Sequence, residues 1–279
     1  MDGAKQTIWH QAYIRALATI TSLRNHCDFT FEKDSKNAKE VKILGAVKPE
    51  VRAYVPGRSI TRDSISSTSQ VLELNQYKYF NIGIDDVVKA QTVPGAMEAT
   101  AKEGSLALAE EGDKYVASIV KTADEAGTIE NVAKASISKT NVVEKIEDGF
   151  VKLYDNNCRV TDTFHLEVSP AVFSKLRQSL TEVYTDNVEM AKKGIVGKYA
   201  NALVSIENNL PTSTDKTYRM NILRTNKAVA FAEQIDKVEA YRPQDAFEDA
   251  LKGLYVFGAK IVRPKEIVTI REQVSTTSI

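Results

Sequence analysis

The sequence predicts an α+β fold in which one long helix lies against β-sheets. Residues 94–122 carry small and apolar residues at helical spacing, which indicates an unusually long helix. β-favouring residues gather in residues 71–84 and again in residues 218–270. Predicted helices and strands do not alternate regularly along the chain, which favours α+β over a parallel α/β sheet.

The predicted helix at residues 94–122 has a stripe of small residues. The stripe consists of Met97, Ala101, Gly104, Leu108, Gly112, Tyr115 and Ile119. Pro94 suits a first helical turn, and Gly127 is a plausible stop. Small side chains allow close approach, so we expect Gly104, Leu108 and Gly112 to form a packed spine. The alternative is an ordinary amphipathic helix whose two glycines are exposed.

Composition places the chain among ordinary globular proteins. Its 279 residues suit one large or two modest domains, with 43% hydrophobic and 27% charged residues. The 37 basic residues equal the 37 acidic ones, so the basic excess of a typical nucleic-acid binder is absent. Two cysteines are too few for a disulfide framework. The sequence contains no apolar run long enough to span a membrane and no signal-peptide core.

The N-terminal third alternates between apolar and polar patterns. Residues 7–23 predict a helix in which Trp9 anchors an N-terminal arm. Phe29 and Phe31 suggest a strand, and residues 41–45 suggest another. Strands at residues 51–55 and 71–74 would flank a polar tip. Because an isolated two-stranded ribbon is marginally stable in water, this excursion needs a partner or is a floppy surface loop.

The remaining elements follow from periodicity and caps. Residues 126–140 are small and polar, which suggests a linker. Residues 141–155 predict a helix, and Ser169 and Pro170 suit the cap and first position of another. Further strands are expected at residues 164–168, 203–206, 218–223, 229–231, 251–262 and 267–270.

Motifs for catalysis are scarce. His10, His26 and His165 are scattered without metal-ligand spacing. Residues 194–198, Gly-Ile-Val-Gly-Lys, resemble part of a phosphate loop but lack its full spacing, and Tyr199 replaces the magnesium-binding hydroxyl. A plain turn is the favoured interpretation. We therefore predict no catalytic residue, no metal site and no cofactor, and expect that the protein is not an enzyme.

Several stretches together resemble the major capsid proteins of tailed bacteriophages. They fall in order over roughly residues 8–270, and they comprise residues 74–80, 84–87, 90–91, 194–197, 208–211, 230–234, 237–239 and 253–264. The resemblance implies the Hong Kong 97-type fold. This fold has a peripheral domain with a spine helix and a long sheet, an axial domain, an extended β-hairpin loop and an N-terminal arm.

The resemblance assigns each region a place in that fold. It implies an N-terminal arm and the start of the peripheral domain at residues 1–46, and an extended loop at 47–74. Residues 75–124 would hold the spine helix, residues 125–244 the axial domain, and residues 245–279 the last peripheral strands. An extended loop that reaches over a neighbouring subunit would explain its poor packing within its own chain. We expect Arg58, Arg62 and Asp63 to be its intersubunit contacts.

The function implied is assembly of an icosahedral head shell that encloses double-stranded DNA. The chain would form pentamers and hexamers with itself and contact packaged DNA non-specifically, without a membrane. Because the predicted first helix begins almost at Met1, we expect a separate scaffolding protein, together with a portal protein. The expected location is the virion, with assembly in the bacterial host cytoplasm.

Two other functions remain open from the sequence. An encapsulin-type shell would share the fold but enclose enzyme cargo. The distinct polar excursion and the lack of an obvious cargo-docking signal disfavour it. A hydrolase without a recognisable motif is the remote alternative from another functional class.

Overall fold

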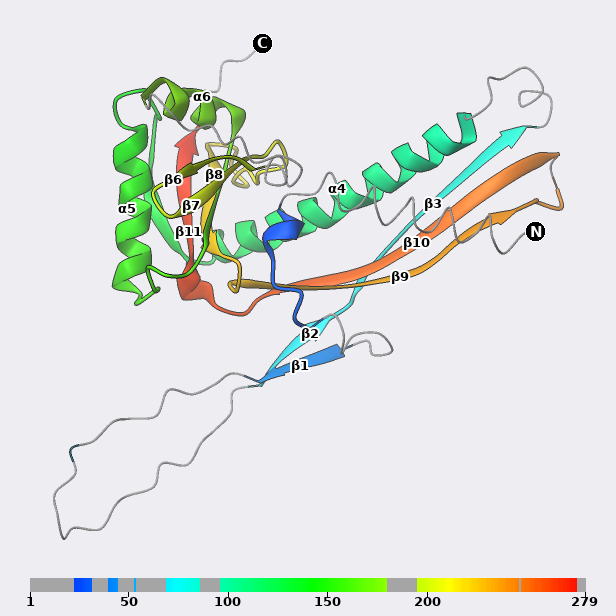
Figure 1. Ribbon diagram of the computed structural model, residues 1–279, viewed down its shortest axis with the longest axis horizontal. Helices are drawn as coiled ribbons and strands as arrows, with labels where there is room; N and C mark the ends of the chain where they lie inside the picture. Colours follow the sequence, from blue (N-terminus) through cyan, green and yellow to red (C-terminus); the bar gives the residue numbers. More distant parts are fainter. Residues whose placement is uncertain are drawn as a thin grey trace, which may run out of the picture.

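The protein is elongated, with a compact part at one end and a long sheet reaching away from it (Figure 1). The computed structural model describes residues 23–31, 40–44, 53, 69–85, 96–179, 195–245 and 247–274. Among these residues, helices and strands form an α+β arrangement, as predicted. The helix α4 runs from the compact part along the long sheet and so connects the two ends.

The long helix α4 spans Ala96–Glu125 and confirms the predicted helix. Its 30 residues give a length of about 45 Å. The helix ends where Gly127 adopts a positive φ of 67°, and the Gly127 amide donates to the carbonyl of Asp124 over 3.1 Å. A glycine at this position tolerates the left-handed backbone that closes a helix, so the predicted stop is also confirmed.

The long sheet lies beneath α4. Its described strands are β3 (Gln76–Asp85), β10 (Glu248–Ile261) and β9 (Val229–Tyr241), paired antiparallel in the order β3-β10-β9. Gly104 and Gly112 are buried on the sheet-facing side of α4. A β-carbon at Gly104 would lie 3.2 Å from Cδ1 of Ile82 and 3.3 Å from Cδ2 of Phe80, so an alanine there would require a small shift of these side chains.

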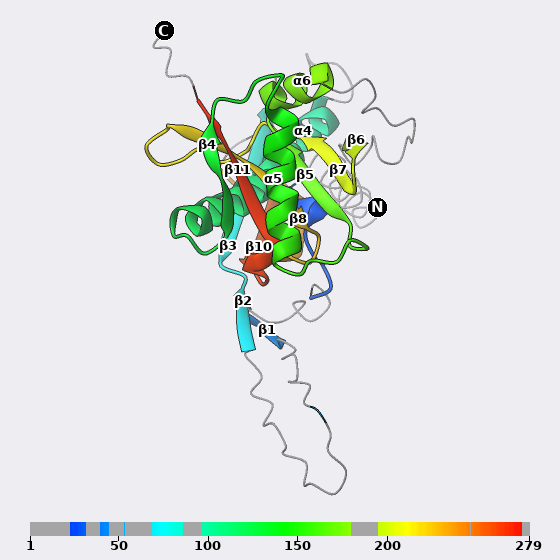
Figure 2. The same ribbon diagram turned by 90° about the vertical axis from the view of Figure 1, so that its left-hand side faces the viewer.

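The compact part is built on a second sheet, here called the compact sheet, with the order β4-β11-β8-β5-β7-β6. Its strands are β4 (Glu130–Ala135), β5 (Phe164–Val168), β6 (Ile195–Tyr199), β7 (Ala202–Ile206), β8 (Tyr218–Thr225) and β11 (Ile267–Gln273). Helix α5 (Val142–Asp155) crosses this sheet, as Figure 2 shows, and α6 (Pro170–Ser179) lies beside it. Ser169 caps α6 as predicted, because its Oγ accepts the Val172 amide at 3.2 Å.

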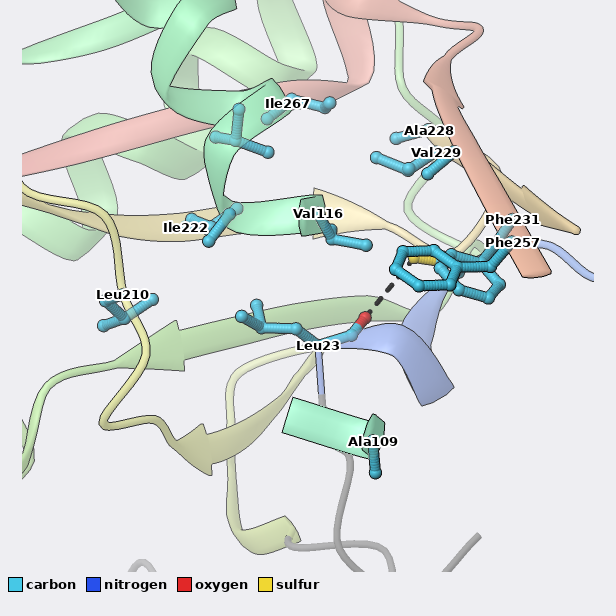
Figure 3. Packing of buried hydrophobic residues seen from close by; sticks show 14 of the residues in the cluster. Leu23, Ala109, Val116, Leu210, Ile222, Ala228, Val229, Phe231, Phe257 and Ile267 are labelled. Carbon is cyan, nitrogen blue, oxygen red and sulfur yellow. Dashed lines mark hydrogen bonds between the residues drawn. The ribbon is translucent and has the colours of Figure 1, made fainter. Parts of the chain in front are cut away.

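One hydrophobic core joins α4 to both sheets. Val116 of α4 packs with Phe231 and Phe257 of the long sheet and with Ile222 and Ile267 of the compact sheet (Figure 3). The rings of Phe231 and Phe257 stack with centroids 5.9 Å apart. The compact sheet is therefore covered by α5 on one face and by the C-terminal half of α4 on the other.

Strand pairing shows how the strands around residue 244 are shared between the two sheets. Strand β9 was expected only at residues 229–231, within the axial segment, but it runs to Tyr241 and pairs with β10 in the long sheet. Strand β11 was expected to complete the peripheral part, yet it pairs with β8 and β4 in the compact sheet. A 3-10 turn at Pro264–Glu266 separates β10 from β11 and redirects the chain.

The second strand of the polar excursion has a partner that the sequence did not indicate. Strand β2 (Ser69–Glu73) pairs antiparallel with β1 (Glu40–Leu44), and the predicted strand at residues 51–55 lies, apart from Ala53, outside the described residues. Val41 and Leu72 are directly opposite and both are buried against the long sheet. The apolar residues of β1 and β2 thus pack together on the long sheet.

Smaller departures have similar causes. Strand β4 lies inside the predicted linker. The sequence did not reveal this strand, because Val132 is its one buried residue and gives little apolar signal. Phe29 and Phe31 do not lie in a named strand; Asp28 alone forms a bridge, to Ala230. Several predicted features lie outside the described residues. They are the helix at residues 7–23 apart from Leu23, with Trp9, then Pro94, and the polar tip at residues 56–69 apart from Ser69.

Substitutions at Gly112 test the packing of α4. A β-carbon there would meet the Tyr255 hydroxyl at 3.5 Å and Cδ of Arg24 at 3.6 Å, which are ordinary contacts. Gly112→Ala should therefore be neutral or stabilising by up to about 1 kcal/mol through helix propensity. Gly112→Leu should overpack and cost about 1–3 kcal/mol. The free energy of unfolding of both variants, measured by chemical denaturation, tests this expectation. Ser118→Leu on the exposed side of α4 is the control.

A Gly112→Leu protein as stable as the wild type would contradict this packing. A loss of stability in Ser118→Leu equal to that in Gly112→Leu would also contradict it, because the effect would then belong to leucine in the helix and not to the packed position.

Candidate functional site

The most distinctive cluster of polar residues is buried where the N-terminal segment meets both sheets. This cluster, here called the polar junction, consists of Arg24, His26, Asp113, His165, Glu167, Ser205, Glu207, Arg224 and Glu233. These residues come from the 3-10 helix η1 (Arg24–His26), from α4 and from strands of both sheets. Sequence patterns alone gave no sign of it, because its members are spread over more than 200 positions.

An ion pair between Arg224 and Glu167 forms the centre of the polar junction. Arg224 Nε and Nη2 donate to the two carboxylate oxygens of Glu167 over 3.1 and 2.7 Å, and both side chains are 0% exposed. Burial alone would raise the pKa of Glu167, but the Arg224 charge and the hydrogen bonds from His26 and Arg224 outweigh it and lower the pKa to about 2. Arg224 Nη2 also donates to the Leu23 carbonyl over 2.7 Å.

Arg24 ties the N-terminal segment to α4 and the long sheet. Its amide donates to Oδ1 of Asp113 over 2.8 Å, and its guanidinium pairs with Glu233. The Tyr255 hydroxyl donates to the other oxygen of Glu233 over 2.7 Å. The guanidinium carbon lies 5.6 Å from the centroid of Phe231, a cation–π distance.

Two histidines that looked scattered in the sequence stack at the polar junction. The rings of His26 and His165 have centroids 4.1 Å apart, and His26 Nδ1 lies 2.9 Å from Oε1 of Glu167. Burial, with the nearby His26 and Arg224, lowers the pKa of His165 to about 3. His165 is therefore neutral near pH 7.

The polar junction is arranged for holding segments together. Among the described residues, no group of three or more His, Cys, Asp or Glu side chains is placed to hold a metal ion. Burial raises the pKa of the Cys27 thiol, which stays protonated and hence a weak nucleophile.

Gly197 and Lys198 lie in strand β6, paired with β7, and form neither a phosphate loop nor the turn that we expected.

The outer face of the long sheet carries a shallow pocket of about 500 Å³. It is lined by Tyr79, Phe80, Asn81, Glu239, Lys252, Gly253 and Leu254. Its charged groups are paired with each other, since Lys252 Nζ lies 3.3 Å from Glu239 and 5.0 Å from the centroid of the Tyr241 ring. Asn81 donates to the Tyr241 hydroxyl over 2.9 Å.

Large apolar side chains are exposed at both ends of the molecule. On the long sheet, Tyr79 is 77% exposed, and Phe247 is 82% exposed in the connection between β9 and β10. On the compact part, Val151 and Tyr154 project from α5 and Val160 from the following loop. Among the described residues, no helix has the length and hydrophobicity needed to cross a membrane.

The residues singled out from the sequence fall into two groups. Gly104, Leu108 and Gly112 lie together on the buried side of α4. The other group, Trp9, Arg58, Arg62 and Asp63, lies outside the described residues.

Breaking the central ion pair should be strongly destabilising. Arg224→Met would leave the Glu167 carboxylate buried without its charge partner, which costs about 3–5 kcal/mol. Adding Glu167→Leu should recover part of this loss, because the unpaired charge is then removed. The control is Lys114→Met, since the Lys114–Glu111 pair on α4 is largely exposed and contributes at most about 1 kcal/mol. If denaturant unfolding showed equal losses for Arg224→Met and Lys114→Met, the central role of the pair would be wrong.

Acid should weaken the polar junction in two steps. The folded-state pKa of His165 is depressed to about 3 from 6.5, so stability is lost as pH falls through this interval. The pKa of Glu167 is depressed to about 2 from 4.5, so its contribution is lost at lower pH. Unfolding free energy measured from pH 7 to 3 should therefore decrease, and the decrease should be smaller in His165→Phe. An unchanged acid slope in this variant would exclude His165 as a cause.

Comparison with known proteins supplies the context for this geometry. No protein-family model matches the chain, and no curated protein matches it by sequence. Among solved structures, one of Mycobacterium phage Che8 matches with a TM-score of 0.72 and 27% identity over 90% of both chains. A capsid structure of the cyanophage P-SCSP1u matches with a TM-score of 0.65 and 17% identity, over 86% of this chain and 85% of that one.

A virus-like particle from Pyrococcus furiosus also matches, with a TM-score of 0.58 and 16% identity, over 94% of this chain and 97% of that one. The similarity to the phage structures extends over both sheets and α4, because it covers about nine-tenths of the chain. The chain therefore has the Hong Kong 97-type fold of tailed-bacteriophage major capsid proteins.

Proposed function

We infer that this chain is a major capsid protein that self-assembles into the icosahedral head shell of a tailed bacteriophage. The observation that carries this inference is the match over 90% of both chains with the Che8 phage structure, at 27% identity. The elongated shape supports it, because a long sheet and a compact part joined by α4 offer separated surfaces for neighbouring subunits. Identical chains can then close into rings through heterologous contacts.

The work of such a protein is assembly, and we propose that it has no catalytic activity. The buried polar junction supports this interpretation, because its charged groups engage one another across the elements that they join. The exposed aromatics Tyr79 and Phe247 are available for contacts between subunits. In pentamers and hexamers such side chains would leave water, which is favourable for association.

We further propose the parts that the shell requires. Helix α4 and the long sheet would form the peripheral domain, and most of the compact sheet the axial domain. Residues 47–74 would be the extended loop, and Trp9 would anchor the N-terminal arm. The expected partners are a separate scaffolding protein and a portal protein, with assembly in the host cytoplasm. Packaged double-stranded DNA would be contacted non-specifically, since equal numbers of basic and acidic residues avoid strong binding.

An encapsulin-type shell is the second candidate. The match to the Pyrococcus furiosus particle favours it, because that chain is covered over 97% of its length. The higher TM-score and identity of the Che8 match favour a phage head. The two candidates differ in what the shell contains.

Imaging of the purified chain tests these proposals. For the purified chain, we expect size-exclusion chromatography and negative-stain microscopy to show large particles or their pentameric and hexameric units. Shells that form during infection should contain nucleic acid. Shells filled with enzyme would support the encapsulin candidate. A chain that stays monomeric at high concentration, alone and with the neighbouring gene products of its genome, would contradict both.

The extended loop can be tested separately. Residues 56–69 are polar, with Ile60 and Ile65 as their large apolar residues, and ordering each residue costs about 1–2 kcal/mol. We therefore propose that a neighbouring subunit supplies the contacts that order them. Replacing them with a short Gly/Ser turn should leave a folded, soluble chain that fails to form stable shells. Substituting alanine for Arg58, Arg62 and Asp63 together should weaken the shells less. Shells of normal size and thermal stability from the shortened chain would rule out this role.

A further inference from the structure

Three of the sheet edges in the described part of the chain are protected against further strand pairing. Strand β9 has a register shift opposite Leu254 and Tyr255, and the bridge to Asp28 covers its first residues. The edges of the compact sheet, β4 and β6, have six and five residues, and each has a register shift against its neighbour. Short strands and irregular pairing are common means by which proteins block strand addition at an edge.

Strand β3 is the exception among the described edges. It forms one edge of the long sheet (Figure 1), and its ten residues pair with β10 without a register shift. It contains no proline, and its one lysine, Lys78, pairs with Glu111 of α4 over 3.1 Å. Alternate residues of an edge strand direct their N–H and C=O groups away from the sheet, so β3 presents a long, regular row of backbone groups.

The side chains of β3 alternate between the two faces of the long sheet. Phe80 and Ile82 face Gly104 of α4, as their distances from a β-carbon at that glycine show. Tyr77 and Tyr79 therefore face away from α4, and they are 58% and 77% exposed. A strand added to β3 would continue the backbone ladder and remove part of these aromatic rings from water, which favours association.

We propose that β3 pairs antiparallel with β3 of a second copy of this chain, about a two-fold axis at Asn81. Two three-stranded sheets would then join into one continuous sheet with the order β9-β10-β3-β3-β10-β9. The axis is perpendicular to the sheet, so α4 of both copies lies on the same face. Such a contact uses the same surface on both copies. The inference deepens the proposed function, because it names a surface through which two copies meet.

The residues of β3 fit this self-pairing. Directly opposite side chains must lie on the same face, so the numbers of paired residues must add up to an even number. With Asn81 on the axis, every residue of β3 except Gln76 has a partner. Phe80 then lies opposite Ile82 of the second copy, an aromatic and β-branched pair of the kind that stabilises adjacent strands.

Charge and polarity also favour the axis at Asn81. On the outer face, Asn81 meets Asn81 of the second copy, so a polar amide lies opposite a polar amide. Lys78 lies opposite position 84, an isoleucine, so no like charges are opposed. An axis at Phe80 would instead place the charged Lys78 opposite the apolar Ile82. A second copy of β3 thus supplies matching side chains along the centre of the strand.

Disulfide trapping in the full chain tests the pairing. Directly opposite residues of an antiparallel ladder have Cα atoms about 4.5–5.5 Å apart, which is within disulfide range. Asn81→Cys should therefore form a covalent dimer under mild oxidation, detected by non-reducing gel electrophoresis. The wild type gives the background from Cys27, which is buried, and from Cys158, which is partly buried.

Tyr79→Cys is the matched control for this experiment. It is exposed on the same strand and the same face. In the proposed register, however, it lies opposite position 83, so the two introduced cysteines would be about 13 Å apart along the strand. We expect about tenfold less dimer from Tyr79→Cys than from Asn81→Cys, because this distance is beyond disulfide range.

A charge on the axis gives a second measurement. Asn81→Lys would place two lysines directly opposite each other, and like charges in this position weaken strand pairing. The dissociation constant of the dimer, measured by sedimentation of the unassembled chain, should increase about twofold to fivefold. Ser118→Lys, on the exposed side of α4, is the control and should keep the wild-type value.

The outcomes separate this pairing from the proposed function. Shells without an Asn81→Cys dimer would overturn the pairing and leave the capsid proposal intact. The dimer in a chain that forms neither shells nor their units would support the pairing and count against the capsid proposal. Equal dimer yields from Asn81→Cys and Tyr79→Cys would overturn the register. If Asn81→Cys failed to fold, a dissociation constant unchanged by Asn81→Lys would still overturn the pairing.

Discussion

The ion pair between Arg224 and Glu167 is the interaction on which the arrangement of the chain depends. It lies where the N-terminal segment, α4 and both sheets meet, and it is wholly removed from water. A buried pair gains little net stability over well-packed apolar residues, but it strongly penalises any arrangement that separates the charges. The pair therefore acts mainly on specificity, because β5, β8 and the Leu23 carbonyl satisfy it only in one relative position.

Local signals explain which parts of the fold could be predicted. Helix α4 has a long stripe and a glycine stop, α6 has Ser169 and Pro170, and β10 is a long β-favouring run. The ordered resemblance to capsid proteins added the fold type. Local patterns could not specify partners at a distance, so the sequence predicted a strand at residues 267–270 but not its pairing with β8. Both strands are apolar, and nothing in their own residues states which sheet they complete.

The polar junction was beyond prediction for a related reason. His26 and Glu167 are separated by 141 positions, and a lone histidine or glutamate has no periodicity to reveal it. The packing of Gly104 and Gly112 could be predicted from the sequence, because their helical spacing places them on one side of α4. Candidate residues on a regular element can thus be inferred from spacing, whereas a cluster made by tertiary contacts needs the fold.

The route of the chain between the two ends has a mechanical consequence. Among the described residues, the chain passes between the long sheet with α4 and the compact sheet at residues 126–129, 226–228 and 262–266, each a short connection. Asp124, in the last turn of α4, also accepts hydrogen bonds from Thr269 and Arg271 of β11. Bending one end against the other would strain all these links together. A force applied at the distant β9–β10 connection would therefore be transmitted to the compact part as a torque, because the molecule would rotate as one rigid body.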